Sequence, residues 1–170
     1  MCMFLGTGSA CRFSVSPDRI CVPLGKKLKV KGHLSKMGIM EIGKVPVTRL
    51  AEKCGTPLLV YDEEKIENKI KSYMRNFSSP LFQTEVVYAS KAFGCPAMIE
   101  KVKDAGASLD VVSGGELYIA KVSGMNMEKV YFHGNNKTSE EINTALEFGC
   151  GNIVADNPEE FRTIIETAAC

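Results

Sequence analysis

Residues 85–91 read Glu-Val-Val-Tyr-Ala-Ser-Lys, a short apolar run that ends in a lysine. Three further apolar runs of this kind follow, at 108–112, 130–133 and 152–155. Each run precedes a segment with the spacing of an amphipathic helix; these segments are 96–105, 115–122, 139–148 and 158–167. Nearly continuous apolar strands that alternate with helices predict an α/β fold with a parallel sheet buried on both faces.

The repeating unit fits either an α/β barrel or a doubly wound sheet, because the period is the same in both. No glycine-rich phosphate loop follows the first strand, which favours the barrel. A complete (β/α)8 TIM-type barrel needs about 250 residues. The 170-residue chain is therefore expected to hold a partial barrel of about four strands. We expect Val87 and Val111 to point into the barrel.

The N-terminal part of the sequence is organised differently. Residues 28–31 alternate apolar and basic side chains, as a half-exposed strand does. A helix is predicted at 46–54, a strand at 57–61, and a helix from 63 to 77 with Asp62 as its cap. We divide the chain into an unassigned leader at 1–27, an N-terminal segment at 28–62 and the partial barrel at 63–170.

Reactive groups of parallel α/β folds lie at the C-terminal ends of the strands. Lys91 ends the first run, and partial burial of its stem would make the amine a better nucleophile toward an aldehyde; a lysine that reaches solvent from the rim is the alternative. Asp110 lies within an apolar strand and needs a partner, catalytic or structural. His133 is either an acid–base group or an ordinary loop histidine. Gly114–Gly115 either offers N–H groups to an anion or forms a tight turn.

Composition excludes several classes of protein. The net charge is +1, so nothing suggests a nucleic acid or an anionic membrane as partner. No run approaches the roughly 18 apolar residues of a membrane span. Seven cysteines without a C-x-x-C pair, together with two histidines, make a metal site improbable and indicate free thiols in a reducing compartment. Residues 1–40 hold seven basic residues and one acid, Asp18, so residues 1–27 are either a transit peptide or a leader without an address.

Three ordered motifs resemble the ornithine, diaminopimelate and arginine decarboxylase family, whose catalytic domain is an alanine-racemase-like barrel. The motifs are YASKAF at 88–93, SLDVVSGGEL at 108–117 and YFHGNNK at 131–137. The last two are similar to the diaminopimelate branch in particular. The resemblance runs from about residue 32 to the C-terminus.

The resemblance implies that Lys91 forms a Schiff base with pyridoxal 5'-phosphate and that Ala89 and Asp110 lie beside this cofactor. It implies decarboxylation of meso-diaminopimelate to lysine, a small amino-acid substrate, a homodimer and a cytoplasmic location, or a plastid if 1–27 is a transit peptide. It also assigns 28–62 to a second, β-rich domain and makes 85–90 the first barrel strand.

Other family elements find no match in the sequence. These are the histidine that stacks on the cofactor ring, the glycine-rich phosphate loop, the glutamate that faces the pyridine nitrogen and the C-terminal substrate residues. We therefore expect the chain to be inactive alone. Two alternatives stay open: a related decarboxylase acting on ornithine, arginine or carboxynorspermidine, and a truncated product without catalysis that at most associates with a full-length partner.

Overall fold

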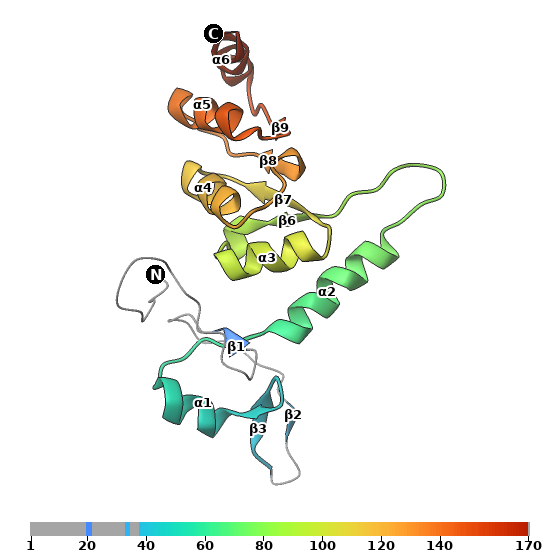
Figure 1. Ribbon diagram of the computed structural model, residues 1–170, viewed down its shortest axis with the longest axis vertical. Helices are drawn as coiled ribbons and strands as arrows, with labels where there is room; N and C mark the ends of the chain where they lie inside the picture. Colours follow the sequence, from blue (N-terminus) through green and yellow to red (C-terminus); the bar gives the residue numbers. More distant parts are fainter. Residues whose placement is uncertain (1–19, 22–32, 35–37, 170) are drawn as a thin grey trace. The chain divides into compact units, whose positions relative to one another are not determined.

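The computed structural model describes residues 20–21, 33–34 and 38–169. The chain divides into two compact units, Met1–Lys69 and Ile70–Cys170, and each is described by itself (Figure 1). The strand predicted at 28–31 and nearly all of the predicted leader at 1–27 lie outside the described residues.

The second unit contains the parallel sheet that the sequence predicts. Its strands pair in the order β6 (Val87–Ala89), β7 (Ser108–Val111), β8 (Val130–Phe132) and β9 (Asn152–Ile153). The helices that follow them are α3 (Pro96–Asp104), α4 (Gly114–Val122), α5 (Ser139–Phe148) and α6 (Pro158–Ala168). Two 3-10 turns, η1 (Ser90–Ala92) and η2 (Met127–Lys129), complete the unit. The predicted α/β fold with four consecutive parallel strands is confirmed.

The two faces of this sheet differ in burial. Helices α4 and α5 lie on the same side of the strands (Figure 1), and the core residues Leu109, Val111 and Phe132 are fully buried. Asp110 has the opposite parity and turns to the other face, as does Val87, which is 39% exposed. The expectation that Val111 points into the barrel is wrong, because a strand that turns Asp110 to the open face must turn Val111 to the helices.

Local chemistry sets the ends of the helices. Helix α5 begins with a capping box, in which Thr138 and Glu141 satisfy each other's backbone N–H groups. It ends at Gly149, whose φ of 75° is a left-handed conformation that glycine adopts without strain. Pro158 occupies the first turn of α6, where its missing N–H costs no hydrogen bond.

The first unit consists of short antiparallel pairings and one helix. Strand β1 (Ile20–Cys21) pairs with β5 (Tyr61–Asp62), and β3 (Met40–Ile42) pairs with both β2 (His33–Leu34) and β4 (Val45–Pro46). Helix α1 (Val47–Cys54) confirms the helix predicted at 46–54, and its Leu50 packs with Ile42 and Val45. Strand β5 is shorter than the predicted strand at 57–61 and is not part of the parallel sheet.

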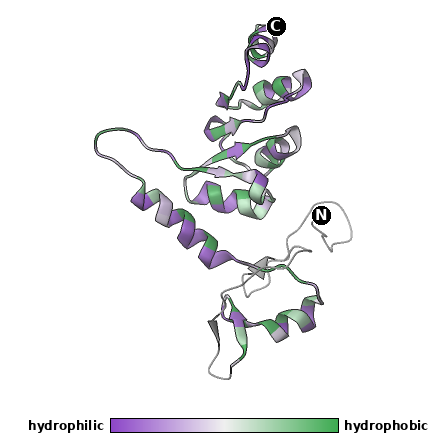
Figure 2. Cartoon of the chain, turned by 180° about the vertical axis from the view of Figure 1, so that it is seen from behind, coloured by the Kyte–Doolittle hydropathy of each residue, from purple (hydrophilic) through white to green (hydrophobic). Residues whose placement is uncertain are grey.

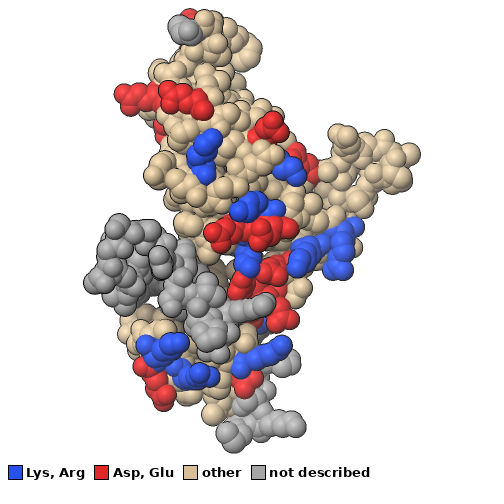
Figure 3. Space-filling view, viewed as in Figure 1, with Lys and Arg blue, Asp and Glu red and all other residues tan. Residues whose placement is uncertain are grey.

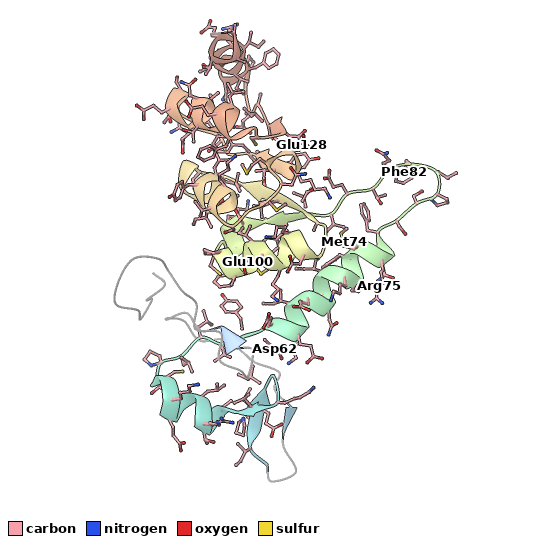
Figure 4. All side chains as sticks on the ribbon, in the orientation of Figure 1. Asp62, Met74, Arg75, Phe82, Glu100 and Glu128 are labelled. Atoms are coloured by element: carbon pink, nitrogen blue, oxygen red, sulfur yellow. The ribbon has the colours of Figure 1, made fainter. Side chains whose placement is uncertain are left out.

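Helix α2 (Glu63–Asn76) begins as predicted, because the carboxylate of Asp62 accepts a hydrogen bond from Lys65 N at 3.1 Å. The helix is largely hydrophilic (Figure 2). The division between the two units falls within it, and the three predicted domains remain predictions. The connection that follows, 77–86, carries Phe82, which is 65% exposed (Figure 4).

The surface carries charges of both signs. Basic and acidic side chains are interspersed on the face that Figure 3 shows. Across the residues described, no helix combines the length and apolar character that a bilayer crossing demands.

Candidate functional site

Lys91 lies where the sequence places it, at the C-terminal end of β6. The strand is shorter than predicted, because it ends at Ala89 and residues Ser90–Ala92 form η1. Lys91 is exposed, whereas Ser90 beside it is only 1% exposed. The expected partial burial of the Lys91 stem stays a prediction.

Asp110 and Ala89 are neighbours across the sheet. Their Cα atoms are paired in the β6–β7 register, and Asp110 is paired in turn with Tyr131 of β8. The Asp110 side chain is 20% exposed, and its Oδ1 lies 3.8 Å from Nδ1 of His133. The structure thus groups Ala89, Asp110 and His133 at the edge of the sheet that also carries Lys91.

Glu116 ties the turn that carries Lys91 to the end of the next strand. One carboxylate oxygen, Oε2, accepts hydrogen bonds from Ser90 Oγ at 2.6 Å and from Val112 N at 2.8 Å. Helix α4 presents Glu116 for this contact, because Ser113 caps the helix by accepting from Glu116 N at 3.3 Å. Glu116 therefore fixes the position of Ser90, the residue directly before Lys91.

Glu141 makes the corresponding connection in the next strand–helix repeat, between the loop before α5 and the start of α4. It accepts from Thr138 N at 3.0 Å and from Gly114 N at 2.7 Å. These two hydrogen bonds hold the pKa of Glu141 below its usual value. A Cβ on Gly114 would lie 3.1 Å from Cγ of Glu141. Gly114 thus packs closely against Glu141, and its N–H donates to a carboxylate of the chain itself.

Glu160 repeats the arrangement in the last unit. Its Oε2 accepts from Asp156 N at 2.7 Å, and its Oε1 lies 3.0 Å from Nζ of Lys137. Burial raises the pKa of Glu160, but the hydrogen bonds from Asp156 N and Lys137 outweigh it and leave the pKa below its usual value. Three successive helices thus use a first-turn glutamate to join two neighbouring loops.

The roles of these three glutamates were not predicted from the sequence. Their signal is a repeated pattern in which a capping residue precedes glutamate by three positions: Ser113/Glu116, Thr138/Glu141 and Asn157/Glu160. The pattern predicts the start of a helix. It does not reveal that each carboxylate also reaches the preceding βα loop.

A second polar cluster lies on the open face, toward the N-terminal end of the strands. Glu85 accepts hydrogen bonds from the hydroxyl groups of Ser108 and Tyr131. These bonds, with Ser108 the larger effect, lower the pKa of Glu85, and the same carboxylate raises the pKa of Tyr131. The open face is therefore polar at several levels of the sheet.

The remaining candidate groups are thiols. Cys54 is exposed, Cys95 is buried and Cys150 is half-buried, and burial raises the pKa of the Cys150 thiol. Within the part of the chain that the structure describes, no group of three His, Cys, Asp or Glu side chains could hold a metal ion.

Comparison with known proteins identifies the family. Residues 63–169 match the family described as "Pyridoxal-dependent decarboxylase, pyridoxal binding domain". The chain is 52% identical over 120 residues to diaminopimelate decarboxylase of Bacillus subtilis, covering 71% of this chain and 27% of that protein. The corresponding enzyme of Halalkalibacterium halodurans is 49% identical over 127 residues, covering 75% of this chain and 28% of that protein.

The fold agrees with this match. The crystal structure of diaminopimelate decarboxylase from M. jannaschii in co-complex with L-lysine superposes with a TM-score of 0.68 at 35% identity. The superposition covers 79% of this chain and 32% of that one. The chain thus spans about a third or less of the length of these relatives, and its parallel unit is part of a TIM-type barrel. Because the matched domain covers more than half of its residues, the chain belongs to the pyridoxal-dependent decarboxylase family.

Proposed function

We propose that Lys91 carries pyridoxal 5'-phosphate through its Nζ amine, and that the protein decarboxylates meso-diaminopimelate to lysine and carbon dioxide. The observation that carries the proposal is that the two lysines at the C-terminal edge of the sheet differ in exposure and in ion pairing. The loops that follow β6 to β9 contain Lys91 and Lys137 and no other lysine. The Lys137 side chain is 1% exposed and paired with Glu160, whereas Lys91 is exposed.

The groups beside Lys91 fit an aldehyde cofactor. A carboxylate and an imidazole, from Asp110 and His133, lie at the same edge and can orient or exchange protons with a bound ligand. Glu116 holds Ser90 and so limits where the Lys91 backbone can move. Bound pyridoxal phosphate supplies an electron sink for the carbon that loses carbon dioxide, while the chain supplies attachment and orientation.

The substrate assignment rests on the relatives. Those described above are named diaminopimelate decarboxylase, and the M. jannaschii structure holds L-lysine, which would be the product of the proposed reaction. The motifs at 108–117 and 131–137 lie within the matched domain and supply the Asp110–His133 pair.

We also infer that the protein acts as a homodimer in the cytoplasm and binds neither nucleic acid nor membrane. The near-neutral net charge of +1 supports the absence of a polyanionic partner. The bacterial relatives support a decarboxylase that acts on a small amino acid.

Reductive trapping tests the proposal. The chain is incubated with pyridoxal phosphate, reduced with borohydride and mapped by peptide mass spectrometry. We expect a pyridoxyl adduct on Lys91 that is lost in Lys91→Ala, while Lys137→Met retains it. An adduct on Lys65, Lys101 or Lys137 in place of Lys91 would contradict the assignment. Release of carbon dioxide from meso-diaminopimelate, compared with ornithine and arginine, by the natural gene product tests the substrate.

A further inference from the structure

The ion pair between Lys137 and Glu160 is buried. Their side chains are 1% and 6% exposed, and Nζ lies 3.0 Å from Oε1. The ammonium also donates to Gly134 O at 2.5 Å and lies 5.6 Å from the centre of the Phe132 ring. Lys137 thus has three partners: the carbonyl of Gly134 in its own loop, the ring of Phe132 at the end of β8, and the carboxylate of Glu160 on helix α6.

Stability alone is a poor reason for such a pair. Removing two charges from water costs free energy that the pair recovers only with good geometry, and apolar replacements are often as stable. What the pair does achieve is a fixed distance between two loops. Glu160 is held on the far side by Asp156 N, so the β9 exit, Glu160, Lys137 and the β8 exit form one continuous chain of contacts.

The held segment begins immediately after His133. The backbone N–H of His133 donates to Val111 O at 2.8 Å and so continues the ladder between β7 and β8. Gly134 then takes a φ of 105°, and a Cβ there would lie 3.0 Å from Val112 O. The Lys137 ammonium donates its hydrogen bond to the carbonyl of this same residue. His133 therefore lies between two fixed segments. Its own N–H is held in the ladder with Val111, and the turn at Gly134 that follows it is held by the hydrogen bond from Lys137.

We propose that Lys137 and Glu160 are a positioning pair that sets the 133–137 loop and thereby places His133 against Asp110. The proposal deepens the proposed function, on which it rests, because the Asp110–His133 pair shares its edge of the sheet with Lys91. Neither Lys137 nor Glu160 needs to touch the cofactor or the substrate. Their effect is on the geometry of the imidazole, which lies 3.8 Å from the carboxylate of Asp110.

Imidazole NMR reads this geometry directly. The chain has two histidines, His33 and His133, so His33→Gln assigns the His133 signals in a long-range proton–nitrogen spectrum. Asp110→Asn defines the nitrogen shift of a His133 that has lost its partner. The test variant is the double substitution Lys137→Met with Glu160→Gln, which removes both charges and leaves an amide oxygen to accept from Asp156 N. Glu159→Gln is the matched control, because its side chain is 78% exposed on the same helix.

We expect the double variant to keep its circular dichroism and cooperative melting while the His133 signals move toward those of Asp110→Asn or split into several. The control should leave them unchanged. Wild-type His133 signals in a folded double variant would overturn the proposal, and so would unfolding of the double variant, since the pair would then be structural. The Lys91 adduct is measured separately: if wild-type chain forms none, the proposed function fails while the NMR result still decides the role of the pair.

Discussion

Removal of the Glu116 carboxylate should loosen the turn that carries Lys91. In Glu116→Ala, Ser90 Oγ and Val112 N lose an acceptor that lies 2.6 and 2.8 Å away, and Ser90 is only 1% exposed. A hydrogen bond to a charged group contributes about 1.5–3 kcal/mol, so the two bonds together stabilise the fold by roughly 3 kcal/mol or more. Glu116→Gln keeps an oxygen that can accept both bonds, and since charge assistance roughly doubles a bond, it should lose about half as much.

Urea unfolding of the chain, followed by far-ultraviolet circular dichroism, measures these losses. The control is Glu100→Ala on helix α3, where Glu100 is exposed (Figure 4), and it should change the free energy of unfolding by no more than about 0.5 kcal/mol. The rate of borohydride trapping on Lys91 should fall in the order wild type, Glu116→Gln, Glu116→Ala. Equal free energies of unfolding for Glu116→Ala and Glu100→Ala would refute the reasoning.

Two further predictions concern stability at low pH and the substitution of a closely packed glycine. The pKa values of Glu141 and Glu160 are lowered by folding, so the stability they contribute is present above the usual value of 4.5 and is lost as the pH falls through their folded pKa values. A pH series of thermal melts should therefore show stability declining below about pH 4.5, and Glu141→Gln should flatten that decline; a wild-type curve that stays flat to lower pH would contradict this. Gly151→Ala should displace β9, because a Cβ at this position would overlap the backbone oxygen of Glu128. Unfolding by urea should show a loss of several kcal/mol, and a variant as stable as wild type would show that the two segments are not this close.

Regular elements could be predicted because their signals are local. Strands β6 to β9 and their helices follow from apolar runs, helical spacing and closing glycines such as Gly149, and the cap at Asp62 follows from residue type alone. The residues at which strands end could not be predicted from local signals alone. The run at 85–90 reads as one strand, yet it leaves the ladder after Ala89, because Ser90 turns inward to Glu116.

The site could be predicted only where a residue's own position carries the information. Lys91 and Asp110 were found because each stands at or in an apolar strand, and their roles remain predictions. The direction of Val111 was predicted wrongly because successive side chains of a strand point to opposite faces of the sheet, so Val111 cannot share a face with its neighbour Asp110. The partner of Lys137 could not be predicted, since Glu160 is 23 residues away and meets it only after β8 and β9 have paired.

Helix electrostatics explains which charged side chains meet the ends of the helices at the two edges of the sheet. At the edge where helices begin, the partial positive charge of their N-termini favours carboxylates, and Glu116, Glu141 and Glu160 fill that role. At the opposite edge lysines donate to carbonyls at or just beyond helix ends, Lys103 to Ser123 O at 3.3 Å and Lys121 to Phe148 O at 3.2 Å. Structural cations thus lie mostly away from the site. Because Lys137 is neutralised by Glu160, the exposed amine of Lys91 is left at the carboxylate-rich edge, where an aldehyde can reach it.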